Sequence, residues 1–99
     1  MQLAFSGDLW FWRGPSPFHF VTVPPAEAAA IGEVAGAVSY GWGMIPVTAH
    51  LDRDGRTTTW ATSLWPKDGA YIVPVKKVVQ DAHDLDLGDV LDLRLDIAT

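Results

Sequence analysis

The chain contains no cysteine, so no disulfide can staple the fold and no thiolate can bind a metal or act as a nucleophile. It also lacks an apolar run of about 18 residues, the length that a membrane-spanning helix needs. Its first residues, MQLAFSGDLW, have no basic flank and include an early acid, Asp8, unlike a secretory signal peptide. These absences predict a cytoplasmic protein without membrane association.

Basic residues are scarce, because seven Lys and Arg face twelve Asp and Glu, giving a net charge of -5 at pH 7. An acidic surface repels the nucleic-acid backbone, so DNA and RNA are not expected partners. His19, His50 and His83 show no metal-ligand spacing, and neither a metal nor a cofactor is predicted. With 99 residues, one domain over 1–99 is expected, as a monomer or a homodimer.

Aromatic residues are what the chain has in quantity. Its five tryptophans are Trp10, Trp12, Trp42, Trp60 and Trp65. Large rings help a small domain to fill its core, and this is one interpretation. The other is a pocket lined by aromatic side chains.

Alternating apolar residues and turn signals predict a series of strands. A hairpin joins 2–12, where Gly7 suggests a bulge or bend, to 18–23 through a turn at 13–17. Further strands are expected at 42–51, 56–65, 70–73 and 91–97. The last strand alternates most regularly, and its predicted inward face is Leu91, Leu93, Leu95 and Ile97.

Two short helices are predicted, one from Pro25 to about Gly36 and one over 75–82. The second is expected to bury Val75, Val78, Val79 and Ala82. The segment from Val21 to Pro24 and its helix are echoed fifty residues later by Tyr71 to Pro74 and a second helix. The sequence therefore predicts a mainly β fold, a barrel with two short α-helices, built from pseudo-two-fold strand-helix-strand units and resembling a split barrel.

Several segments together resemble a bacterial family, the domain of unknown function 1905 (DUF1905). They are FHFVTVP at 18–24, GWG at 41–43, WATSLWP at 60–66, YIVPVKKVV at 71–79 and LGDV at 87–90. The resemblance implies a compact β-barrel with short helices, found alone or ahead of a second domain, and it implies no reaction. Met44, Pro46 and Gln80 stand where the family often has a serine, a basic residue and an arginine, which weakens an anion-binding role taken from the family. The pattern at 72–90 is also similar to half of an AbrB-type swapped-hairpin regulator, but the acidic balance disfavours DNA binding.

Lys76 and Lys77 form the electrostatic oddity of the sequence. Two cations in the first turn of a helix oppose its macrodipole. Asp81, four residues after Lys77, can pair with it, whereas the residue four after Lys76 is the neutral Gln80. Lys76 is therefore either a solvated side chain or a contact to a polar ligand group.

These observations lead to the hypothesis of a small binding module with an aromatic-lined barrel pocket for an apolar or aromatic small molecule or a peptide. Its predicted ligand-binding residues are Trp42, Trp60 and Trp65 for stacking, and Thr62, Ser63 and Lys76 for polar contacts. One alternative is a pocket-type enzyme, an isomerase or cyclase with His19, His50 or Lys76 as the proton donor. The other is a protein-protein interaction domain without a ligand.

Overall fold

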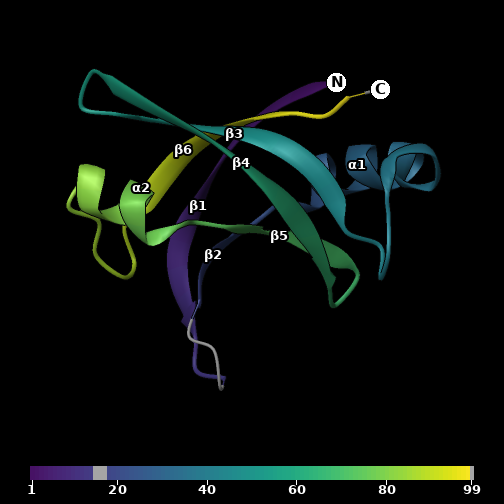
Figure 1. The fold of residues 1–99 in the computed structure, drawn as a ribbon, viewed down its shortest axis with the longest axis horizontal. Helices are drawn as coiled ribbons and strands as arrows, with labels where there is room; N and C mark the ends of the chain where they lie inside the picture. The colour runs from purple at the N-terminus through teal and green to yellow at the C-terminus, as the bar shows by residue number, and fades with distance from the viewer. Residues whose placement is uncertain (15–17, 99) are drawn as a thin grey trace.

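Six antiparallel strands close into a barrel in the computed structural model, which describes residues 1–14 and 18–98 (Figure 1). Around the barrel the strand order is β1-β2-β5-β4-β3-β6. The strands are β1 (Gln2–Trp12), β2 (Phe18–Thr22), β3 (Ile45–Arg53), β4 (Arg56–Lys67), β5 (Ala70–Pro74) and β6 (Val90–Asp96), and the helices are α1 (Pro25–Val38) and α2 (Lys77–Ala82). The predicted mainly β barrel with two short helices is confirmed.

The barrel consists of two halves with the same connectivity, β1-β2-α1-β3 and β4-β5-α2-β6. Exchanging each element of one half for its counterpart in the other returns the same circular strand order. The equivalent strands β2 and β5 lie side by side, with Val21 opposite Val73 and Thr22 opposite Ile72. The two helices lie on opposite sides of the barrel (Figure 1). The repeat seen in the sequence therefore corresponds to a pseudo-two-fold topology.

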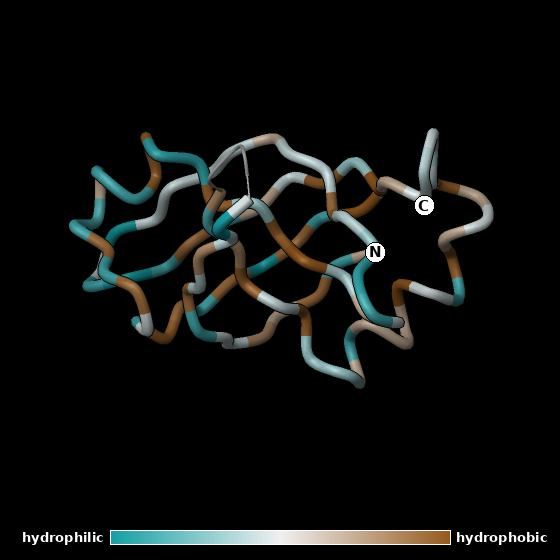
Figure 2. The backbone as a smooth tube through the Cα atoms, turned by 90° about the horizontal axis from the view of Figure 1, so that it is seen from below, coloured by the Kyte–Doolittle hydropathy of each residue, from teal (hydrophilic) through white to brown (hydrophobic). Residues whose placement is uncertain are grey.

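Alternate residues of each strand point into one core. Hydrophobic and hydrophilic stretches accordingly alternate along the chain (Figure 2). The four predicted inward residues of the last strand are each at most 2% exposed: Leu91, Leu93, Leu95 and Ile97. The helix α1 adds Ala28 and Ile31 to this core, and α2 adds Val79. Each helix thus covers part of the barrel with small or branched apolar side chains.

Gly7 does not form the predicted bulge. It pairs with Leu91 within a regular ladder that runs from Gln2 to Asp8 against β6. A Cβ at Gly7 would lie 2.7 Å from Val21 Cγ1 and 3.2 Å from the Thr22 carbonyl oxygen. The glycine therefore permits a close approach of β2, at the point where β1 changes its partner from β6 to β2.

The helices differ in detail from the prediction. α1 continues past Gly36 to Val38, and α2 begins at Lys77. Val75 stays extended because its backbone N–H donates to the His19 carbonyl, which prolongs the ladder between β5 and β2. This shifts the helix register, so the side chain of Val78, predicted to be buried, is 70% exposed. Of the described helices, neither has the length and apolar character needed to cross a membrane.

The turns between strands follow the sequence signals. Asp54 and Gly55 have φ of 52° and 74°, as the two central residues of a tight hairpin turn require. Glycine has no Cβ and therefore tolerates this left-handed backbone at position 55, and the predicted β3-β4 hairpin is confirmed. The predicted turn at 13–17 includes residues 15–17, which lie outside the described residues.

Candidate functional site

A seam opens in the barrel wall where β5 ends. β5 pairs with β4 over 65–67, whereas β4 pairs with β3 from Arg56 to Leu64. On the other side of β5, the last paired residue is Pro74, opposite Phe20. Beyond Pro74, the start of β2 and the middle of β4 are no longer bridged by a strand. We call this opening the seam, and the chain crosses it on the way to α2.

The seam holds a groove of about 700 Å³, called here the α2 groove. Its apolar lining consists of Phe11, Phe18, Trp65, Pro74 and Val75, and its polar lining of His19, Thr62, Lys76, Lys77 and Gln80. A volume of this size and an apolar wall with a few polar groups are typical of sites for small molecules.

The aromatic wall of the groove belongs to a larger cluster on the outer face of the barrel. Phe20 lies at its centre, fully buried, with its ring centroid 5.2 Å from that of Trp10 and 5.1 Å from that of Trp65. Phe18 contacts Trp65 edge to face at 5.7 Å. The Trp10 indole N–H donates to Thr22 Oγ1 at 3.0 Å. These contacts hold the rings of Phe18 and Trp65 in place at the groove.

Three polar side chains, those of Lys76, Gln80 and His19, lie along the seam. Lys76 Nζ donates to the Ala61 carbonyl oxygen on β4 at 2.8 Å. Gln80 Nε2 donates to the Val75 carbonyl oxygen, also at 2.8 Å. The imidazole of His19 lies against the ring of Phe11, with centroids 5.1 Å apart. The rim of the groove therefore carries hydrogen-bond donors next to an apolar lining.

Three of the six predicted ligand-binding residues line this groove: Thr62, Trp65 and Lys76. Trp60 does not, because it is 7% exposed and belongs to the core, where its indole N–H donates to the Pro74 carbonyl oxygen at 3.1 Å. Ser63 lies on the opposite face of β4 from Thr62, and its hydroxyl is hydrogen-bonded to the Tyr40 hydroxyl at 2.7 Å. Whether the three lining residues bind a ligand stays a prediction.

Trp42, predicted to stack on a ligand inside the barrel, does not line the α2 groove. Its side chain is 95% exposed. It stands in the loop between α1 and β3, flanked by Gly41 and Gly43, both with positive φ, and closed by the bridge between Tyr40 and Met44. This tight turn projects the indole into solvent instead of toward the barrel.

Phe11 and Phe18 line the groove without being among the predicted site residues. Both belong to the β1-β2 hairpin, in which Phe11 pairs with His19 and Trp12 with Phe18. The alternation in Phe18-His19-Phe20 was visible as a strand, but the sequence did not show that the hairpin end faces α2. That placement depends on strand order, which local patterns leave open.

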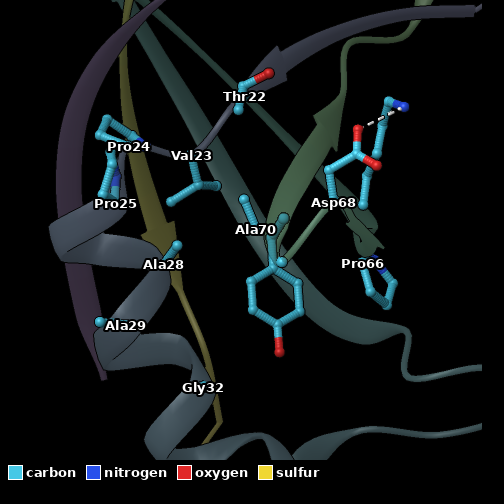
Figure 3. Close-up of a pocket in the computed structure, with 13 residues that line it drawn as sticks. Thr22, Val23, Pro24, Pro25, Ala28, Ala29, Gly32, Pro66, Asp68 and Ala70 are labelled. Atoms are coloured by element: carbon cyan, nitrogen blue, oxygen red, sulfur yellow. Dashed lines mark hydrogen bonds and ion pairs between the residues drawn. The ribbon is translucent and has the colours of Figure 1, made fainter.

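A second groove, called here the α1 groove, lies beside the start of α1 (Figure 3), which the pseudo-two-fold topology makes the counterpart of α2. Its volume is about 790 Å³. Its walls are the start of α1 and the β4-β5 hairpin, including Pro24, Pro25, Ala28, Ala29, Gly32, Pro66, Asp68 and Ala70. The lining includes one aromatic ring, that of Tyr71, against those of Phe11, Phe18 and Trp65 in the α2 groove, and the cation Lys67 is paired with Asp68 at 3.1 Å. The α2 groove is therefore the better candidate for ligand binding.

His50, a proton-donor candidate of the enzyme alternative, belongs to a different surface. It bridges Thr59 Oγ1 through Nδ1 at 2.8 Å and Asp96 Oδ2 through Nε2 at 2.7 Å, across three neighbouring strands. The hydrogen bond to His50 lowers the pKa of the Asp96 carboxyl. A hollow next to Asp96 has a volume of about 140 Å³, far smaller than the α2 groove. The contacts of His50 therefore support the sheet and leave little space for a substrate.

The same surface carries an ion pair between Arg94 and Asp52. Arg94 Nε donates to Asp52 Oδ2 at 2.7 Å, and this hydrogen bond, with a second one from Thr57, lowers the pKa of Asp52 from 3.8 to about 2. A lowered folded-state pKa contributes stability that is present above pH 3.8 and is lost as the pH falls toward 2.

We therefore expect Asp52→Asn to flatten the decline of the melting temperature between pH 3.8 and about 2. Arg94→Met should flatten it in the same way, because the pair requires both partners. Thermal melts by circular dichroism at closely spaced pH values provide the measurement. Variants whose melting curves run parallel to the wild type through this window would show that the pair has no part in acid unfolding.

No metal site is indicated within residues 1–14 and 18–98, where no group of three or more His, Asp or Glu side chains is placed to hold an ion. Searches of curated proteins and of solved structures gave no match to the chain. A family model, described as Domain of unknown function (DUF1905), matches residues 5–95, and this span includes both helices and the whole lining of the α2 groove. The protein is a member of the DUF1905 family.

Proposed function

We propose that this domain is a small-molecule binding module whose site is the α2 groove. The observation that carries the proposal is the combination, in one groove of about 700 Å³, of a fixed aromatic wall with polar side chains at its rim. Phe18 and Trp65 supply ring surface, and Thr62 and Lys76 supply donors. Because the cluster around Phe20 already orders the rings, a ligand would lose little free energy to ordering them.

The test is a titration with a panel of aromatic compounds, followed by tryptophan fluorescence and by thermal melting. A ligand that binds the folded state should change the fluorescence saturably and raise the melting temperature by mass action. Trp65→Phe should remove most of the fluorescence change, since Trp65 lines the groove. Trp42→Phe is the matched control, because the Trp42 indole is exposed to solvent outside the groove.

Two results would count against this site. A panel that gives no saturable response contradicts the binding proposal and favours the protein-protein interaction alternative. A response that is lost in Trp42→Phe and kept in Trp65→Phe would move the site to the loop before β3.

A pocket-type enzyme is a second candidate, favoured by one observation. His19 and Lys76, two proton-donor candidates from the sequence, line the same groove as the aromatic wall. An isomerase or cyclase of this kind would return some bound compound with its mass unchanged and its structure altered. Chromatography of the panel compounds after incubation separates the two candidates, because a binding module releases every compound unchanged.

The cytoplasmic location, the bacterial origin, the monomeric or homodimeric state and the absence of nucleic-acid partners stay predictions from the sequence. They enter the proposal as its setting: a free intracellular domain that meets a dissolved ligand. A cytoplasmic location is open to test by fractionation of cells that express the chain.

A further inference from the structure

The α2 groove is a cationic region of an acidic protein. The whole chain has a net charge of -5, yet the groove is lined by Lys76 and Lys77, and its lining contains no carboxylate. Lys77 reaches Asp81 on the solvent side, at 3.2 Å between two largely exposed side chains. A pair this exposed is weak, so the Lys77 side chain can exchange Asp81 for another anion at little cost.

Lys76 has no carboxylate partner among the described residues. Its ammonium group donates to the neutral carbonyl oxygen of Ala61, which holds the group across the seam at a fixed place. An ammonium group has three N–H donors, so two remain for a further acceptor. A cation fixed in this way beside an apolar wall is suited to bind an anionic group.

The pair with Asp81 explains Lys77 locally, but no side-chain partner within α2 explains Lys76. Lys76 is the N-cap residue of α2 and makes no side-chain capping hydrogen bond, and cations at this end of a helix oppose its dipole. The fifty-residue offset gives Ala26 and Glu27 as the counterparts in sequence, and these residues lie in the first turn of α1, after its N-cap Pro24. The barrel topology is therefore compatible with a neutral and an acidic residue, and the lysines are particular to the α2 groove.

We infer that the ligand of the α2 groove is a small aromatic carboxylate, with its ring against Phe18 and Trp65 and its carboxylate at Lys76. This inference rests on the proposed binding function and adds the chemical class of the ligand. The volume of about 700 Å³ fits a single small molecule. Lys77 strengthens the attraction without direct contact, and Thr62 contributes a hydroxyl to the same lining.

The experiment compares three probes of matched shape by isothermal titration calorimetry: 2-naphthoate, 2-naphthamide and 2-naphthylmethylammonium. We expect the carboxylate to bind at least about tenfold more tightly than the amide, as one charge-assisted hydrogen bond implies, and the ammonium compound to bind most weakly. The preference should shrink as salt is added, because the groove is open to solvent.

Variants locate the preference. Lys76→Met should bring the affinity for 2-naphthoate down to that for the amide, and should leave the amide unchanged. Lys76→Gln should do the same while keeping a donor for the Ala61 carbonyl, so it separates lost charge from a loosened seam. Lys67→Met, in the α1 groove, is the matched control and should keep the full preference.

The possible outcomes test the carboxylate inference separately from the proposal that the α2 groove binds a small molecule. Equal affinity for all three probes, or tighter binding of the amide or the ammonium compound, would overturn the anion inference and leave the binding module standing. A preference for the carboxylate that survives in Lys76→Gln also overturns it. Absence of binding by every probe in the panel overturns both. Tighter binding of a short peptide ending in tryptophan than of the naphthoate would overturn the small-molecule part, since the occupant is then a chain terminus.

Discussion

Replacing Leu93 with aspartate should unfold the barrel. Leu93 is 1% exposed and stands between Phe5 on β1 and Leu51 on β3, both of which face the core. A carboxylate at this position loses its hydration and finds no partner, at a cost of several kcal/mol or more. A domain of this size has a total stability of about 5 to 15 kcal/mol, so the folded population should largely disappear. Circular dichroism and a thermal melt measure the result.

The adjacent Asp92→Asn is the matched control and should melt like the wild type. Asp92 points outward and accepts a hydrogen bond from Ser6 Oγ at 2.5 Å, and an asparagine carbonyl oxygen can accept the same bond. The two substitutions are at neighbouring positions, but Leu93→Asp changes the inward face of β6 and Asp92→Asn its outward face. A Leu93→Asp variant that keeps the wild-type melting curve would mean that the inward face of β6 is assigned to the wrong residues.

The barrel was largely predictable because β6 and the hairpin turns carry strong local signals. Alternation from Leu91 to Ile97 assigns a face to each residue, and the tight turn at Asp54-Gly55 fixes the β3-β4 register. The strand, proline and helix repeated at Pro24 and Pro74 indicated two related halves. The alternation and the turn each lie within about ten residues of sequence, where propensity and periodicity are informative.

The site was less predictable because it depends on where strands stop. The seam exists because β5 ends at Pro74 and pairs with only the last part of β4, residues 65–67, although β4 begins at Arg56. No local pattern in the sequence shows that the two strands differ in this way. Trp60 and Trp65 look alike in the sequence, yet five residues of strand place them on opposite faces of β4, one in the core and one at the groove. Lys76 was found because its conflict with the helix dipole is a local, physical signal.

Pseudo-symmetry explains how one barrel can hold two grooves with different chemistry. Each groove forms between the start of a helix and the end of the hairpin from the other half, so the topology supplies both. The side chains differ: beside α1 the lining is mostly prolines, alanines and a glycine with one tyrosine, whereas two phenylalanines and a tryptophan line the α2 groove. The proposed function therefore depends on side chains from both halves that meet at only one of the two grooves.

Trp60→Ala should be the most destabilising change at the seam. Removing a buried tryptophan side chain typically costs about 3 to 5 kcal/mol. Here the change also removes the indole donor to the Pro74 carbonyl oxygen, which joins β4 to the end of β5. Trp60→Phe keeps most of the apolar volume and loses the hydrogen bond, so it should cost about 1 to 3 kcal/mol. Urea unfolding gives both values, with Trp42→Ala as a control expected to change stability by less than about 0.5 kcal/mol, because its indole is exposed.

Hydrogen exchange can show whether Trp60 acts on the seam itself or on the core as a whole. The amides of Val79 and Gln80 donate to the Lys76 carbonyl oxygen, so their exchange reports on the start of α2. If the indole hydrogen bond fixes Pro74 and the segment after it, Trp60→Phe should speed exchange at these two amides more than at the β6 amides of Leu93 and Leu95. Equal acceleration at both places would mean that Trp60 contributes only core volume, and that Lys76 is held at the groove by its bond to Ala61 without help from the tryptophan beneath it.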